Sequence, residues 1–218
     1  QSSYVQTYLE RDVRSLRAVG DLGDFRRLLT ALAARTGSLI NFADLARDLG
    51  VTAKTVQAWV SVLEASGQVV VVKPYHATVG KRLVKRPKVY FLDSGTLAYL
   101  LALDRPGQVF EGMAAGPILE AFAFGQLYRL FLNRGESPRI TFWRTADGHE
   151  VDFVIEDGGR VYPIEVKLTS TPALRHAAGI VRFRELLGRK AGPGLMMCLC
   201  QERVPLARGV DAVPIGVV

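Results

Sequence analysis

EVDFVIEDGGRVYPIEVK, residues 150–167, is the stretch that decides the fold of this chain. Its two halves have the composition of β-strands, and Gly158-Gly159 between them suits a two-residue turn, because glycine takes positive φ at both turn positions. In such a hairpin, residues whose numbers sum to 317 face each other. We therefore expect two facing pairs on one face of the sheet, Asp152 with Glu165 and Glu150 with Lys167.

The other face of this hairpin is apolar and fits a buried core; it holds Val151, Phe153, Ile155, Ile164, Val166 and Leu168. Facing side chains have Cβ atoms about 4.5–5.5 Å apart, so the carboxylates of Asp152 and Glu165 repel each other unless a cation joins them. Mg²⁺ or Mn²⁺ would supply that charge, and Lys167 would lie beside the ion, where its ammonium can hold an attacking water or stabilise a phosphate. The alternative is a solvent-facing hairpin whose charges form ordinary surface ion pairs.

A third acid, Glu120, interrupts a nearly all-round apolar helix that we expect over residues 116–133. A lone carboxylate in a buried helix is costly without a partner, and a metal ion would be one such partner. The alternative is that Glu120 bridges or caps internally. We predict Glu120, Asp152 and Glu165 as metal ligands, and catalytic roles for Lys167, Asp152 and Glu165.

The periodicity of the apolar residues predicts an α/β (α+β) fold with two domains. Residues 1–106 are expected to form a helical, winged helix-turn-helix domain, and Pro106-Gly107 marks its end. Residues 107–218 follow the order α-β-β-β-α-β. The expected elements are helices over 4–16, 25–34, 42–49, 52–63, 93–103, 116–133 and 173–187, and strands over 69–72, 88–91, 140–145, 150–156, 161–168 and 195–200.

The basic charge of the chain lies mostly in its first half. The formal net charge is +7, of which residues 1–110 carry +6. An excess of this size favours a polyanion such as DNA. The predicted nucleic-acid contacts are the polar face of the second helix of the helix-turn-helix (Lys54, Thr55, Gln57, Ser61) and the basic loop that would form the wing (Lys81, Arg82, Lys85, Arg86, Lys88). A protein-docking role and a merely solvated loop are the alternatives.

Other composition features narrow the cellular setting. The two cysteines, Cys198 and Cys200, lie in one apolar run and are expected to be buried, reduced thiols. Neither a bilayer-spanning apolar stretch nor a signal peptide is evident, so we expect a cytoplasmic protein without a membrane partner. The three histidines lack the spacing of a zinc site.

Glu120 on a helix, then Asp152, then Glu165-Val166-Lys167, on this order of elements, resembles the restriction-endonuclease-like PD-(D/E)XK superfamily over residues 112–200. The resemblance implies DNA hydrolysis that depends on Mg²⁺ or Mn²⁺. In many active members the helix after the lysine brings a further polar residue such as Gln or Tyr. Here that helix offers only Arg175 and His176.

A wider resemblance is to the C-terminal half of prokaryotic AAA-type ATPases. It rests on YVQTYLERD (4–12), a winged helix, YFLDSG (90–95), and the motifs around Asp152 and Lys167. The resemblance implies that a P-loop ATPase domain precedes this segment, that ATP binds only there, and that the C-terminal domain is of unknown function. The start at Gln1 agrees with truncation, and the chain has no Gly-x-x-x-x-Gly-Lys-Ser/Thr motif, so we expect no ATPase activity from it.

Two functions follow from these features. The first is an endodeoxyribonuclease that depends on Mg²⁺ or Mn²⁺. The second is a non-catalytic module that keeps the nuclease fold as a scaffold and binds DNA or a protein. The expected partners are DNA, the chain's own ATPase domain and a further protein.

Overall fold

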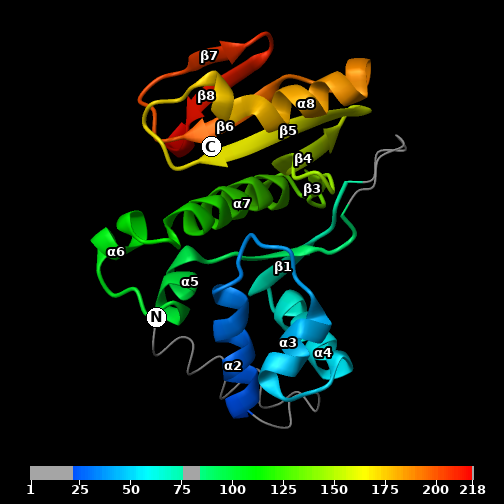
Figure 1. The fold of residues 1–218 in the computed structure, drawn as a ribbon, viewed down its shortest axis with the longest axis vertical. Coiled ribbons are helices and arrows are strands. Elements are labelled where there is room, and N and C mark those ends of the chain that lie inside the picture. The colour runs from blue at the N-terminus through cyan, green and yellow to red at the C-terminus, as the bar shows by residue number, and fades with distance from the viewer. Residues whose placement is uncertain (1–21, 76–83, 218) are drawn as a thin grey trace. The chain divides into compact units, whose positions relative to one another are not determined.

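The computed structural model describes residues 22–75 and 84–217 and shows a mixed α/β fold. The predicted helix over 4–16 and the predicted DNA contacts Lys81 and Arg82 lie outside the described residues. The described chain divides into two compact units (Figure 1). Unit 1 contains residues 22–71 and 86–122, and unit 2 contains residues 72–75, 84–85 and 123–217.

Unit 1 consists of helices followed by a two-stranded sheet and two more short helices. Asn41 and Thr52 cap successive helices, since their side chains accept the backbone N–H groups of Ala43 at 3.0 Å and Thr55 at 3.1 Å. The helices over 42–49 and 53–65 and both strands are thus close to where the sequence predicts them. The elements are α2 (Leu22–Ala33), α3 (Phe42–Leu49), α4 (Ala53–Ala65), β1 (Val69–Val72), β2 (Lys88–Phe91), α5 (Ser94–Leu100) and α6 (Pro106–Glu111).

Unit 2 is built on a six-stranded sheet with the strand order β3-β4-β5-β6-β8-β7. The sequence predicts its first four strands but not β7 and β8. β5, β6 and β8 run parallel, while β3, β4 and β7 run antiparallel to their neighbours. The strands are β3 (Ile140–Arg144), β4 (Glu150–Asp157), β5 (Arg160–Lys167), β6 (Gly194–Cys198), β7 (Val204–Ala207) and β8 (Val210–Pro214).

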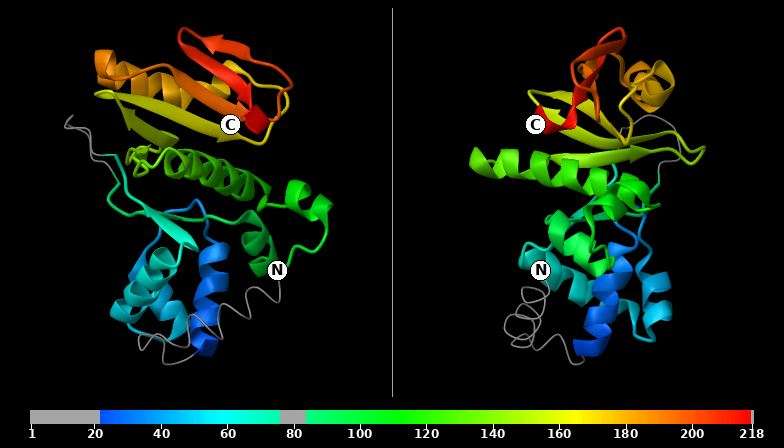
Figure 2. Two further views of the ribbon diagram at one scale, coloured as in Figure 1. Left: turned by 180° about the vertical axis from the view of Figure 1, so that it is seen from behind. Right: turned by 90° about the vertical axis from the view of Figure 1, so that its left-hand side faces the viewer.

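Helices cover both faces of this sheet (Figure 2). The connection between the parallel strands β5 and β6 contains α8 (Ala178–Leu187), as a parallel pair requires. Phe183 of α8 packs edge-on against Trp143 of β3, with ring centroids 5.4 Å apart. On the opposite face, Phe124 of α7 (Ala115–Asn133) lies 5.6 Å from Phe153 of β4. Burial on both faces explains why β4 and β5 are largely apolar.

The β4–β5 hairpin keeps the predicted register from its turn as far as Phe153 with Ile164, but the predicted pairs of Asp152 with Glu165 and Glu150 with Lys167 are not among its register pairs. Its pairs run from Asp157 with Arg160 to Phe153 with Ile164, and all of them sum to 317. Gly158 and Gly159 form the turn with φ values of 55° and 75°. Positive φ at both positions is what a tight primed turn demands, so the turn fixes which residues of the two strands meet.

A β-bulge breaks the strict alternation that the sequence suggests for β4. Thr141 of β3 pairs with Val154, but Trp143 pairs with Val151, so Asp152 and Phe153 together face one residue of β3. Val151 consequently shares a core cluster with Val154 and Trp143, while Phe153 packs on α7. The predicted apolar face that combined Val151 with Phe153 is therefore wrong, because the extra residue rotates one of them to the other side.

The predicted wing is also different in the structure. Its ends join the edge of the unit 2 sheet: the N–H of Tyr75 donates to Phe142 O at 2.6 Å, and the N–H of Val84 donates to Arg144 O at 3.2 Å. Residues 72–75 and 84–85 accordingly belong to unit 2 rather than to unit 1. A basic run predicts exposure to solvent, but its composition does not indicate that the backbone at its two ends pairs with a distant strand.

Helix α7 is continuous across the division between the two units, which falls after Phe122. The domain boundary expected at residues 106–107 coincides instead with the start of α6. α7 is also the most apolar of the long helices, yet none of the helices within residues 22–75 and 84–217 has the length and apolar character that crossing a bilayer requires.

Candidate functional site

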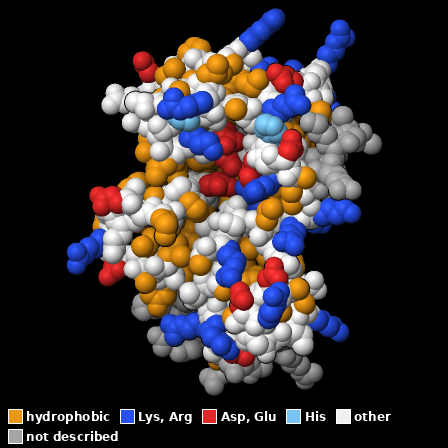
Figure 3. All heavy atoms as spheres, in the orientation of Figure 1, with side chains coloured by type: hydrophobic (Ala, Val, Ile, Leu, Met, Phe, Trp, Pro, Cys, Tyr) orange, Lys and Arg blue, Asp and Glu red, His pale blue; other side chains and the backbone are white. Residues whose placement is uncertain are grey.

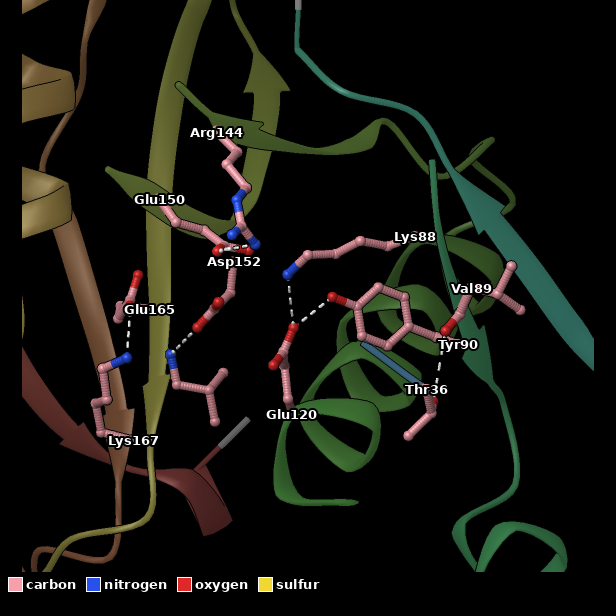
Figure 4. Close-up of polar contacts among 11 residues, drawn as sticks. Thr36, Lys88, Val89, Tyr90, Glu120, Arg144, Glu150, Asp152, Glu165 and Lys167 are labelled. Atoms are coloured by element: carbon pink, nitrogen blue, oxygen red, sulfur yellow. Dashed lines mark hydrogen bonds and ion pairs between the residues drawn. The ribbon is translucent and has the colours of Figure 1, made fainter. Parts of the chain in front are cut away.

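Two adjacent strands of unit 2 each bury a carboxylate. Asp152 of β4 and Glu165 of β5 are each 6% exposed. The N–H of Val166 donates to Asp152 Oδ2 at 2.9 Å (Figure 4), so the bulged strand turns its carboxylate toward β5. Buried carboxylates need compensating charge or hydrogen bonds, and two of them close together need more.

Lys167 supplies part of that charge. Its Nζ lies 2.6 Å from Glu165 Oε1 (Figure 4). The burial of this pair is unequal, because the lysine side chain is 41% exposed while that of the glutamate is 8% exposed. The predicted group of Asp152, Glu165 and Lys167 is therefore brought together within unit 2.

These three residues line one cavity of about 380 Å³. Figure 3 shows acidic side chains gathered in a hollow of the molecular face, with basic and histidine side chains beside them. Glu150 also lines the cavity, and Arg144 Nη1 donates to its Oε2 at 2.9 Å. The full lining is Gly148, His149, Glu150, Asp152, Glu165, Lys167, Arg175, His176, Ala178 and Gly179.

Gly179 determines how closely α8 approaches the strands beneath it. A Cβ added at this position would lie 1.9 Å from the backbone oxygen of Glu150 and 3.8 Å from Glu165 Oε2. Only glycine permits that approach, which brings the start of α8 onto the cavity. Our sequence reading did not single out Gly179, although an isolated glycine within a helical pattern is a signal of close packing.

The donor set suits a hard divalent cation. Mg²⁺ prefers oxygen ligands, keeps several waters, and is usually held by one or two carboxylates together with substrate phosphates. Asp152 and Glu165 meet that minimum. No cluster of three or more His, Cys, Asp or Glu side chains able to hold a metal occurs among the described residues.

Glu120 is placed differently from the prediction. It belongs to unit 1, where Lys88 Nζ lies 3.1 Å from its Oε1 and the hydroxyl of Tyr90 donates to the same oxygen (Figure 4). The internal bridge considered as the alternative is thus what the structure shows. Because Lys88 and Tyr90 already contact its Oε1, the structure favours the internal bridge over the metal-ligand role predicted for Glu120.

The Lys88–Glu120 pair shows that one predicted DNA contact is wrong. The side chain of Lys88 is 2% exposed, so its ammonium cannot reach a phosphate. Of the other predicted contacts on α4, Lys54, Gln57 and Ser61 are exposed, whereas the hydroxyl of Thr55 lies 2.8 Å from that of Thr52 within the helix cap. Lys85 and Arg86 are exposed but fall in different units.

Comparison with known proteins divides the chain in two. Residues 1–107 match a domain of unknown function, DUF8612, and residues 115–218 match another, DUF4143. Proteins of Mycobacterium tuberculosis and Mycobacterium bovis, both described as uncharacterized, are each 33% identical over 216 residues, which is 98% of this chain. The chain spans about half the length of these relatives, 47% in each case.

Proposed function

We propose that unit 2 is a phosphodiester-hydrolysing site that acts on DNA with Mg²⁺ or Mn²⁺. The observation that carries the proposal is the shared cavity of Asp152, Glu165 and Lys167. Two buried carboxylates and an exposed ammonium at one opening are the groups needed to bind a divalent cation and an anionic ester together. This agrees with the nuclease resemblance of residues 112–200.

Each residue has a distinct task in this proposal. Asp152 and Glu165 would hold the ion, and the ion when bound would acidify water and draw charge from the phosphate. The Val166 N–H fixes the orientation of the Asp152 carboxylate before any ligand arrives. Lys167 reaches the same opening on a half-solvated side chain, so its ammonium can shift from Glu165 to a water or phosphate oxygen.

Unit 1 supports a DNA substrate through α4. Lys54, Gln57 and Ser61 lie three and four residues apart and are exposed, so they share one face of the helix. We propose that this face contacts duplex DNA. The resemblance to AAA-type ATPases adds the proposal that an ATPase domain in the longer protein governs access to the substrate.

A second function is a cation-free scaffold that binds DNA or protein without cutting. One observation favours it: Lys167 already lies 2.6 Å from Glu165 and compensates its charge. In that case the ammonium is a structural partner, and the cavity needs no metal.

Cleavage of DNA separates the two functions. Supercoiled and linear DNA would be incubated with Mn²⁺ and wild-type protein, Lys167→Met, or the exposed control Lys190→Met. We expect cleavage by wild type and the control, and a rate lower by about 100-fold or more for Lys167→Met. Equal cleavage by all three proteins, or by none, would remove the catalytic proposal; binding without any cleavage would leave the scaffold.

A further inference from the structure

The residues just before α8 line one side of the cavity. They contribute hydrogen-bond donors rather than carboxylates. Arg175 and His176 lie on the short 3₁₀ turn Leu174–Ala177, and both line the cavity that Asp152 and Glu165 line. The close approach at Gly179 holds this turn over the strands. Carboxylates thus line the cavity from β4 and β5, and nitrogen donors line it from the turn.

The ring of His176 has its proton placed by a backbone contact. The N–H of Ala173 donates to His176 Nδ1 at 3.3 Å, so Nδ1 acts as an acceptor. In the neutral ring the proton must then lie on Nε2, which makes Nε2 a hydrogen-bond donor. A ring fixed in this way can donate to a ligand oxygen in the cavity, but it cannot accept a proton from water through Nε2.

Arg175 adds a permanent positive charge beside it. Its side chain is exposed and makes no hydrogen bond or ion pair with any residue in the described part of the chain. Guanidinium groups bind phosphate through two parallel N–H donors. The nearby acid Glu150 opposes this little, since Arg144 neutralises it at 2.9 Å.

Charge balance then indicates what the cavity accepts. With Glu150 paired to Arg144, the remaining charged side chains that line the cavity are the acids Asp152 and Glu165 and the bases Lys167 and Arg175, so a bound divalent cation would bring their formal sum to +2. One phosphodiester group cannot balance that excess. A second phosphate, next to the first, can.

From these features we infer that Arg175 and His176 form a second phosphate subsite, and that the ligand is a nucleic-acid strand with consecutive phosphates. The inference rests on the proposed function for the position of the first phosphate. Arg175 pairs with two oxygens of the second phosphate, and His176 donates to it from Nε2. An isolated phosphodiester fills only the carboxylate side of the cavity.

Two fluorescent thymidine dinucleotides with a non-hydrolysable phosphorothioate linkage test this, one bearing a 5′-phosphate and one without it. Affinities would be measured by anisotropy in Mg²⁺. We expect the two-phosphate probe to bind wild type about tenfold more tightly than the one-phosphate probe, as one charge-assisted contact allows. Arg175→Gln and His176→Ala should lose that preference, and His176→Gln should retain most of it because it keeps an N–H donor.

Arg189→Gln is the matched control, because Arg189 is exposed on the 3₁₀ turn Gly188–Lys190 and does not line the cavity. Absence of the preference in wild type, or its persistence in both Arg175→Gln and His176→Ala, would overturn the subsite. The readout needs no turnover. A preference that depends on Arg175 in a protein that cuts nothing would sustain the subsite and refute hydrolysis, and cleavage with no such dependence would do the reverse.

Discussion

Two lysine–glutamate pairs, one in each unit, bury opposite members. In unit 1, Lys88 is 2% exposed and its partner Glu120 is 18% exposed. In unit 2, the glutamate is the buried member: the side chain of Glu165 is 8% exposed and that of Lys167 is 41% exposed. The two pairs have similar distances, 3.1 Å and 2.6 Å, so distance alone does not distinguish their roles.

The difference lies in which charge can be replaced. A buried ammonium with a fixed carboxylate and a tyrosine hydroxyl around it forms a closed set, as Lys88, Glu120 and Tyr90 do. A buried carboxylate with a solvated ammonium can exchange that ammonium for another cation. The first arrangement supports a structural role, and the second supports a binding site.

The largest expected effect is on the closed pair. Lys88→Met removes the buried cation and leaves Glu120 with less compensation, and breaking a buried pair costs about 3 kcal/mol of unfolding free energy. Urea denaturation measures the loss, with Lys54→Met on the exposed face of α4 as the control, expected within about 0.5 kcal/mol of wild type. A loss below about 1 kcal/mol for Lys88→Met would mean that the pair is not structural.

The second-largest expected effect concerns the packing of α8 over the unit 2 cavity. Gly179→Ala forces α8 away from the Glu150 backbone and is expected to cost about 2 kcal/mol, within the range for overpacking. The same substitution should leave the Lys88 pair unaffected, so adding Lys88→Met to it should give additive losses. Wild-type stability of Gly179→Ala in urea would show that the close approach is not required.

The Lys167–Glu165 pair should contribute little to the free energy of unfolding. Lys167→Met keeps the aliphatic stem and removes a half-solvated ammonium, so we expect a change of no more than about 1 kcal/mol in the absence of divalent ions. Its urea transition should therefore stay close to that of wild type. A loss as large as that of Lys88→Met would erase the distinction between the two pairs.

The smallest expected effect concerns Cys198 of β6, which is the register partner of Lys167 on the neighbouring strand. Burial raises the pKa of the Cys198 thiol to about 11. The neutral thiol therefore favours the folded state below pH 9, and this contribution is lost as the pH rises through about 11. Wild-type stability should fall more steeply over that range than stability of Cys198→Ala; equal slopes would show that the thiol is not shielded.

Local turn chemistry made the hairpin predictable. Gly158-Gly159 fixes the register through positive φ at both positions, and every observed pair follows from it. The caps Asn41 and Thr52 were predictable for the same reason, since each bonds within its own turn. The bulge at Asp152 was not, because it depends on how β4 meets β3.

The site was predictable in part. Asp152, Glu165 and Lys167 are joined by one hairpin, so their spacing indicated their proximity. The prediction that Lys88 contacts DNA was wrong because a lysine within a basic run usually faces solvent, whereas the burial of Lys88 depends on Glu120, 32 residues away. The position of the turn that carries Arg175 and His176 depends on the close approach of Gly179 to the Glu150 backbone, and a glycine in a helical pattern signals close packing without showing which strand it packs against.

Calorimetric titration with Mn²⁺ tests the central claim most directly, namely that the carboxylates of unit 2 are open to a cation and that of unit 1 is not. Wild type should bind the ion, Asp152→Asn and Glu165→Gln should bind it at least about tenfold more weakly, and folded Glu120→Gln should bind it as wild type does. Binding that survives in both unit 2 variants, or that disappears with Glu120→Gln, would contradict the account.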